Sequence, residues 1–68
     1  MDQTLVAVVR YKSECDVEEV PGVDRMSYGQ ALAELREIAR VAPKRLREFD
    51  IVAVQPDGQL GRYVSWAL

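Results

Sequence analysis

The chain of 68 residues has no histidine and a single cysteine, Cys15. Without histidine, it lacks the commonest metal ligand and the side chain that titrates near neutral pH. One cysteine excludes a disulfide within the chain, and a lone thiol is typical of proteins in a reducing compartment. The composition therefore predicts a cytoplasmic protein without histidine-based metal or acid–base chemistry.

Long apolar runs are also missing. No run approaches the roughly 20 apolar residues of a membrane helix. The apolar stretch near the N-terminus follows an acid and lacks the small-residue cleavage site of a signal peptide. Hydrophobic residues make up 49% of the chain and charged residues 29%, which is typical of a folded domain. We expect residues 1–68 to form a single compact domain.

The strongest local signal is a helix start at Ser27. Gln30 stands three positions later, which is the spacing of a capping box. An apolar stripe at helical spacing follows until Pro43, where a further short helical turn is expected to begin. Apolar, β-branched residues predict strands at 4–11 and 49–54, a last strand from residue 60 after a turn at 55–59, and a short additional strand at 15–20. The predicted fold class is α+β: a single helix packed on a three- or four-stranded, mainly antiparallel sheet, in the order β-(β)-α-β-β.

One helix covers only one face of a sheet, yet the strands at 4–11 and 49–54 are apolar on both faces. The expected core against the helix is Leu5, Ala7, Val9, Leu32, Leu35, Ile38, Phe49, Ile51, Val64 and Trp66. The opposite face is expected to expose Val6, Val8, Val52, Val54 and Tyr63. An exposed apolar patch of this kind often marks an interface, here a possible homodimer contact. The alternative is that these valines are simply good strand formers.

Acidic residues are concentrated at 14–24, where no basic residue interrupts them. They are Glu14, Asp16, Glu18, Glu19 and Asp24. In a strand, alternate carboxylates stand roughly 6.6 Å apart on one face. Such a row could bind a lysine- and arginine-rich surface of a partner. Two plainer explanations stay open: charged edge strands resist edge-to-edge pairing, and acidic loops aid solubility.

The residues of the acidic segment at 14–24, together with Cys15, do not form a pattern typical of a catalytic or metal site. Valines interrupt the oxygen ligands that a calcium loop needs. Cys15 has no nearby base in the sequence, and acidic neighbours disfavour its thiolate. We therefore expect no enzyme activity, no metal and no cofactor.

A basic cluster lies at 36–47 and consists of Arg36, Arg40, Lys44, Arg45 and Arg47. Arginine suits phosphate binding. Glutamates at 34, 37 and 48 dilute the cluster, and no zinc or aromatic RNA-binding motif accompanies it. Direct nucleic-acid binding is the weakest of the interpretations that stay open.

In format, the chain resembles the small anti-CRISPR proteins of phages and mobile elements. The resemblance is one of size, acidity and layout over the whole chain, with "ECDVEEVPGVD" beside the helix that begins at "MSYGQALAELREI". It implies a non-catalytic inhibitor that binds a host RNA-guided (Cascade-type) nucleoprotein complex in the cytosol and blocks DNA binding through acidic residues. The alternatives are a small homodimeric structural or regulatory module of a bacterial operon, and a nucleic-acid binder that uses the basic cluster.

Overall fold

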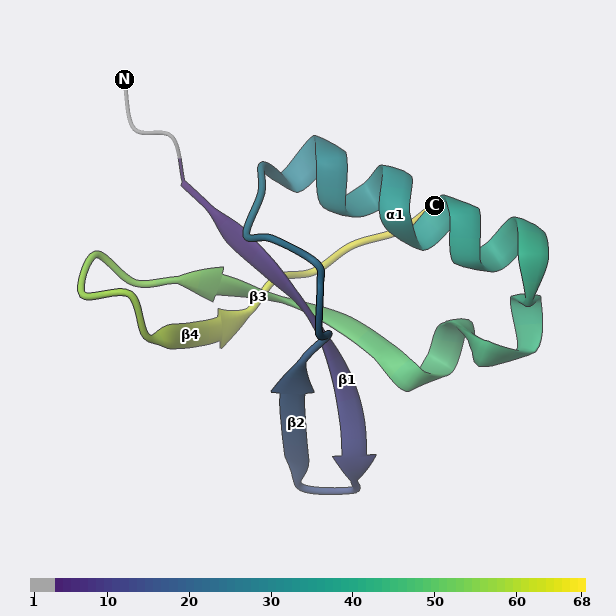
Figure 1. The fold of residues 1–68 in the computed structure, drawn as a ribbon, viewed down its shortest axis with the longest axis horizontal. Helices are drawn as coiled ribbons and strands as arrows, with labels where there is room; N and C mark the ends of the chain where they lie inside the picture. Colours follow the sequence, from purple (N-terminus) through teal and green to yellow (C-terminus); the bar gives the residue numbers. More distant parts are fainter. Residues whose placement is uncertain (1–3) are drawn as a thin grey trace.

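A computed structural model describes residues 4–68 (Figure 1). The elements are β1 (Val6–Ser13), β2 (Asp16–Glu19), α1 (Tyr28–Val41), the short 3-10 helix η1 (Pro43–Glu48), β3 (Phe49–Val54) and β4 (Leu60–Tyr63). All strand pairs are antiparallel, and the sheet has the order β2-β1-β3-β4. The predicted α+β fold class is confirmed. Neither helix of residues 4–68 is long and apolar enough to cross a bilayer.

The ends of α1 are set by the residues that the sequence singled out. The Ser27 Oγ accepts a hydrogen bond of 3.3 Å from the Gln30 N–H, and the Gln30 side chain accepts one of 3.4 Å from the Ser27 N–H. These bonds form the predicted capping box, which satisfies two backbone donors at the helix start. At the other end, Pro43 begins η1, as expected from its fixed φ. The buried face of α1 carries Ala31 and Leu35.

The two faces of β1 are the reverse of the expected ones. Val6 and Val8 pack with Ile51 and the buried face of α1. Ala7 and Val9 point to the opposite face and pack with Val52. The cause is the register of β1 against β3, in which Val8 is the partner of Ile51. Directly opposite residues share a face, so Val8 must follow Ile51 toward the helix. Both faces of β1 are apolar, and the sequence pattern alone could not choose between them.

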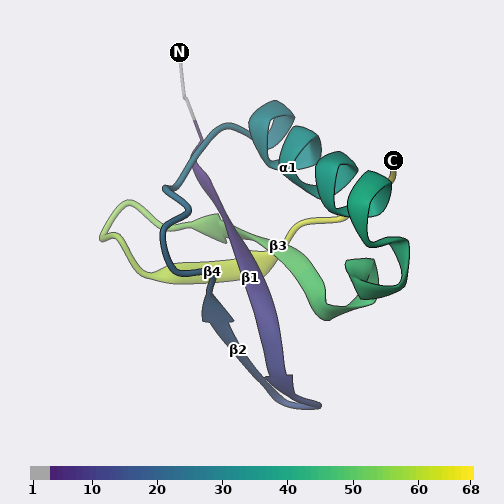
Figure 2. The ribbon, with the colours of Figure 1, turned by 45° about the vertical axis from the view of Figure 1, so that its right-hand side comes forward.

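The face of the sheet away from α1 is buried as well. Val9 is completely buried, and Val17, Val54 and Leu60 pack against the group that it forms with Ala7 and Val52. We call these six residues the second cluster. Val17 lies on β2 and Leu60 on β4, the two outer strands. Figure 2 shows β1 crossing β3, with β2 beside the far end of β1 and β4 alongside β3. The outer strands thus supply part of the cover that a second helix layer would give.

The expected exposed valine face is therefore wrong. Val6, Val8 and Val52 are each no more than 4% exposed, and Val54 is half-buried. Only Tyr63 of the expected set is exposed, at 57%. In the expected core, Leu5 precedes β1 and is exposed.

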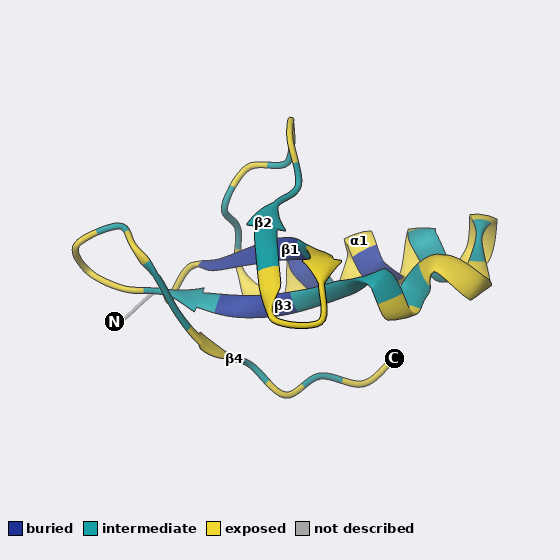
Figure 3. Ribbon diagram, turned by 90° about the horizontal axis from the view of Figure 1, so that it is seen from below, coloured by how far each residue is buried: buried dark blue, intermediate teal, exposed yellow. Residues whose placement is uncertain are grey.

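The hairpin of β1 and β2 projects from the body of the domain (Figure 1). The pairing of β1 with β3 ends at Arg10, so Tyr11 and the residues after it pair only with β2. Figure 3 shows that the buried residues lie in the first half of β1, the middle of β3 and the inner side of α1, while the end of this hairpin is exposed. β2 begins at Asp16, one residue later than predicted, because Glu14 and Cys15 form the turn.

Two loops connect the outer strands to the rest of the fold. After β2, the chain leaves β1 at Val20 and rejoins it at Met26, which pairs with Val6. The excursion between them turns at Gly22, whose φ of +79° favours glycine. The predicted turn at 55–59 is confirmed: Gln55 N–H donates to the Gln59 carbonyl at 2.8 Å, and Gly58 has a φ of +88°. β4 ends at Tyr63, earlier than expected, although the Val64 N–H still donates to the Ile51 carbonyl.

Candidate interaction surface

The predicted acidic residues at 14–24 do not form one free row. Glu18 on β2 is the direct partner of Arg10 on β1, and their side chains form an ion pair of 2.8 Å. Asp16 lies 3.9 Å from the Lys12 Nζ. Both pairs are half-exposed, so each contributes little to stability. They neutralise part of the charge that the sequence assigned to this segment.

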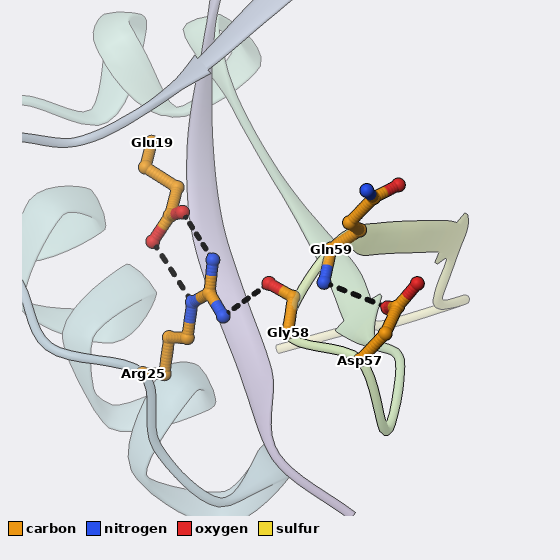
Figure 4. Close-up of polar contacts among 5 residues, drawn as sticks. All are labelled: Glu19, Arg25, Asp57, Gly58 and Gln59. Atoms are coloured by element: carbon orange, nitrogen blue, oxygen red, sulfur yellow. Dashed lines mark hydrogen bonds and ion pairs between the residues drawn. The ribbon is translucent and has the colours of Figure 1, made fainter.

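Glu19 faces the opposite side of β2, where it is the partner of Val9. Its carboxylate accepts two hydrogen bonds from the Arg25 guanidinium, at 2.8 Å from Nη2 and 3.4 Å from Nε (Figure 4). The Arg25 Nη1 also donates to the Gly58 carbonyl. These hydrogen bonds lower the pKa of Glu19 and raise the pKa of Arg25.

Arg25, Glu19 and the Gly58 carbonyl together form what we call the Arg25 bridge. Glu19 belongs to β2 and Gly58 to the β3–β4 turn, so the bridge spans the two outer hairpins on the side of the second cluster. Asp57 holds the same turn by accepting a hydrogen bond of 3.0 Å from the Gln59 N–H. Glu19 therefore has a structural role that its place in an acidic run did not reveal.

Glu14 and Asp24 are the predicted acidic residues that have no ion-pair partner within residues 4–68. Both are exposed. Glu14 lies in the turn at the end of the projecting hairpin, whereas Asp24 lies in the β2–α1 loop. Glu14, and Asp16 with its long 3.9 Å contact to Lys12, are thus the carboxylates most available to a partner at the hairpin end.

A cluster of aromatic side chains around Asp50 was missed by the sequence. Asp50 Oδ2 accepts a hydrogen bond of 2.6 Å from the Tyr11 hydroxyl, and its Oδ1 accepts one of 2.9 Å from the Trp66 Nε1. The Ile51 N–H donates to the same Oδ1 at 2.8 Å. One carboxylate on β3 thereby fixes an aromatic ring from β1 and another from the C-terminal segment.

Two tyrosines of this region are exposed. Tyr11 is 37% exposed, and Tyr63, the partner of Val52 on β4, is 57% exposed. The hydrogen bond to Asp50 raises the pKa of Tyr11 to about 12, with smaller contributions from partial burial, the charge of Asp50 and Tyr63. Tyr63 is the partner of Val52, two positions after Asp50 on β3, so Tyr63 lies on the same face of the sheet as the Asp50 that holds Tyr11. A signal was present in the sequence: Asp50 is a lone carboxylate inside the apolar strand "FDIVAV".

The remaining candidate residues lie elsewhere. Cys15 is exposed in the hairpin turn. Within residues 4–68, no three histidine, cysteine or acidic side chains come close enough to hold a metal ion. In the basic cluster, Arg40 pairs with Glu37, and Arg45 pairs with Glu48 at 3.3 Å.

Comparison of the chain with protein-family models, with curated proteins and with solved structures found no match. The functional argument therefore rests on the residues and contacts described above.

Proposed function

We propose that this chain is a non-catalytic protein-binding domain that contacts its partner with the end of the β1–β2 hairpin and the adjoining tyrosines. The observation that carries the proposal is the exposed pair of Tyr11 on β1, which is held by Asp50, and Tyr63 on β4, beside a β1–β2 hairpin that ends in the exposed carboxylate of Glu14. Tyrosines are enriched among the residues that supply most of the binding energy at protein interfaces.

The hydrogen bond to Asp50 favours this use of Tyr11. A side chain that is already held in one position loses less conformational freedom when a partner covers it. Glu14 and Asp16, on the same hairpin, would meet basic residues of the partner. Charge complementarity of that kind speeds association and fixes the orientation of the complex, while the buried rings supply affinity.

The specific form that we propose is an inhibitor of an RNA-guided nucleoprotein complex, acting in the host cytosol. Its support is the resemblance in format to anti-CRISPR proteins, together with the positively charged channels by which such complexes hold nucleic acid. An exposed free thiol, Cys15, suits a reducing compartment. Within the acidic segment, the expected binding residues narrow to Glu14, Asp16 and Asp24, because Glu18 and Glu19 are held by arginines of the same chain.

The test is a binding measurement with a purified Cascade-type complex, using surface plasmon resonance and a gel-shift assay of DNA binding. Tyr63→Ser should weaken association at least tenfold, which corresponds to about 1.4 kcal/mol. Glu14→Lys combined with Asp16→Lys should slow association and restore DNA binding. The matched control is Glu34→Lys, a charge reversal at an exposed position of α1.

If the control variant lost binding while the hairpin and tyrosine variants kept it, the proposed binding surface would be wrong. Failure of the unaltered protein to bind any RNA-guided complex would reject the inhibitor function while leaving a different protein partner to be sought. Sedimentation of the free protein addresses the homodimeric alternative. A dimer that Tyr63→Ser converts to monomer would assign the tyrosine surface to self-association.

A further inference from the structure

A second surface, away from the hairpin, has the features of a binding groove. An open depression of about 280 Å³ lies between the last turn of α1 and η1. Its apolar lining is Ile38, Val41, Ala42 and Phe49. Val41 is 67% exposed, more than any other large hydrophobic residue of the described chain. A valine in that position lies at the helix end, beyond the part of α1 that covers the sheet.

The surroundings of this groove are positively charged. Residues 36–48 hold five basic and two acidic side chains, which gives a local charge of +3. The two acids, Glu37 and Glu48, already pair with Arg40 and Arg45. The basic residues without an ion pair within residues 4–68 are Arg36, Lys44 and Arg47 in this segment. Lys44 and Arg47 belong to η1, whose Arg45 lines the groove together with Glu37 of α1.

The size and lining of the groove indicate the kind of occupant. Its volume lies below the roughly 300–1,000 Å³ of small-molecule and cofactor sites, and it is open rather than enclosed. It is large enough for one apolar side chain. Single-stranded nucleic acid binds through exposed aromatic rings on which bases stack, whereas the one aromatic residue in this lining, Phe49, is half-buried. An apolar lining within a segment of net positive charge matches an acidic peptide with one apolar anchor.

We infer that the groove formed by Ile38, Val41, Ala42 and Phe49 binds an acidic segment of a partner protein. One leucine- or phenylalanine-sized side chain of that segment fills the groove, and carboxylates on either side of it meet Lys44 and Arg47. The site is separate from the hairpin surface, so it does not depend on the proposed inhibitor function.

The test uses the full chain labelled with ¹⁵N and two synthetic peptides as probes. The first peptide carries one leucine between aspartates and glutamates, and the second has serine in place of that leucine. The leucine peptide should cause saturable chemical-shift changes at Ile38, Val41 and Phe49, and the serine peptide should bind at least tenfold more weakly. Burial of a leucine side chain stabilises by about 1.5–3 kcal/mol, and 1.4 kcal/mol corresponds to tenfold.

Variants separate the apolar and charged contributions. Val41→Gln should weaken binding of the leucine peptide about tenfold, and Lys44→Glu with Arg47→Glu should weaken it and reduce its dependence on salt. Leu5→Gln is the matched control, because Leu5 is also an exposed apolar residue but lies near Val54, at the far end of β3 from Phe49. This control should leave the affinity unchanged. Val41 is exposed, so its substitution should leave the circular dichroism spectrum of the domain intact.

Four results would overturn the inference. The first is the absence of saturable shifts with the leucine peptide, and the second is equal affinity for the serine peptide. The third is tighter binding of a single-stranded oligothymidine, which would assign the segment to nucleic acid. Concentration-dependent shifts at Val41 in the protein without peptide would assign the groove to a second copy of the chain and would also contradict the inference.

Discussion

The carboxylate of Glu19 is held by the guanidinium of Arg25 through two hydrogen bonds, 2.8 and 3.4 Å long. The two residues lie only six positions apart, but Arg25 also reaches the Gly58 carbonyl, 33 positions further along the chain. This arrangement joins two loops that would otherwise be independent. Glu19 is the β2 partner of Val9, so its side of the bridge (Figure 4) lies on the face of the sheet that carries the second cluster.

Glu19→Gln should reduce the acid sensitivity of the fold. The hydrogen bonds from Arg25 lower the pKa of Glu19, so the folded state favours the charged carboxylate. The resulting stability is present above the unfolded pKa of about 4.3 and is lost as the pH falls through the lower folded pKa. Urea midpoints measured at about pH 5 and about pH 3 should therefore fall less for Glu19→Gln than for the unaltered protein. Glu14→Gln, at an exposed position, should leave the difference between the two midpoints unchanged.

Tyr11→Phe should remove a late tyrosine titration. The hydrogen bond to Asp50 raises the pKa of Tyr11 to about 12, whereas an ordinary tyrosine titrates near 10. The neutral phenol is favoured in the fold, so its contribution to stability is complete below about pH 10 and is lost as the pH rises through about 12. Phenolate absorbance should show a titration step near pH 12, and Tyr11→Phe should abolish that step. If Tyr28→Phe abolishes it instead, the assignment to the Asp50 hydrogen bond is wrong.

Val9→Ala should destabilise the domain by about 1.5–3 kcal/mol, as much as Val8→Ala does on the other face. Val9 is completely buried in the second cluster, and Val8 is 4% exposed against α1. Urea denaturation followed by tryptophan fluorescence measures both changes. A near-zero effect of Val9→Ala would mean that the face away from α1 is open to water. Val41→Ala, at an exposed site, should change stability by no more than about 0.5 kcal/mol.

Ser27→Ala should cost about 1 kcal/mol, because it removes the acceptor for the Gln30 N–H at the start of α1. Thermal unfolding followed at the helical circular dichroism band measures the loss. Ser65→Ala tests the same chemical change outside the helix and should have little effect, since the contact of Ser65 with Tyr28 is made by its backbone carbonyl. A larger effect of Ser65→Ala than of Ser27→Ala would contradict the capping role.

The features that were predicted correctly are set by interactions between residues that are close together in the sequence. The capping box needs only Ser27 and Gln30, the end of α1 needs only Pro43, and the turn at 55–59 needs only its own proline, aspartate and glycine. These signals mark one helix, and the apolar β-branched segments mark the strands around it. One helix and several strands can form a common core only if the helix packs on a sheet, so the α+β class was predictable.

The features that the sequence missed depend on pairing across the sheet. The faces of β1 follow from the opposition of Val8 and Ile51, and no local pattern specifies that register when both faces are apolar. The charge of the acidic segment was overestimated because Arg10 and Arg25 lie outside it in sequence but against it in space. The Tyr11–Asp50 contact joins residues 39 positions apart, so the lone carboxylate in "FDIVAV" did not by itself identify Tyr11 as its partner.

The Arg25 bridge also limits how the loops of this fold can vary. Surface loops usually tolerate insertions, since closing a longer loop costs little entropy. Here a change in the length of the β2–α1 loop would require a compensating change in the β3–β4 turn, because Arg25 of the loop must still reach Gly58 of the turn. Among related chains, changes in these two loops should be coupled. The Glu14–Cys15 turn has no such contact within the described chain, so variation in length and charge should concentrate there.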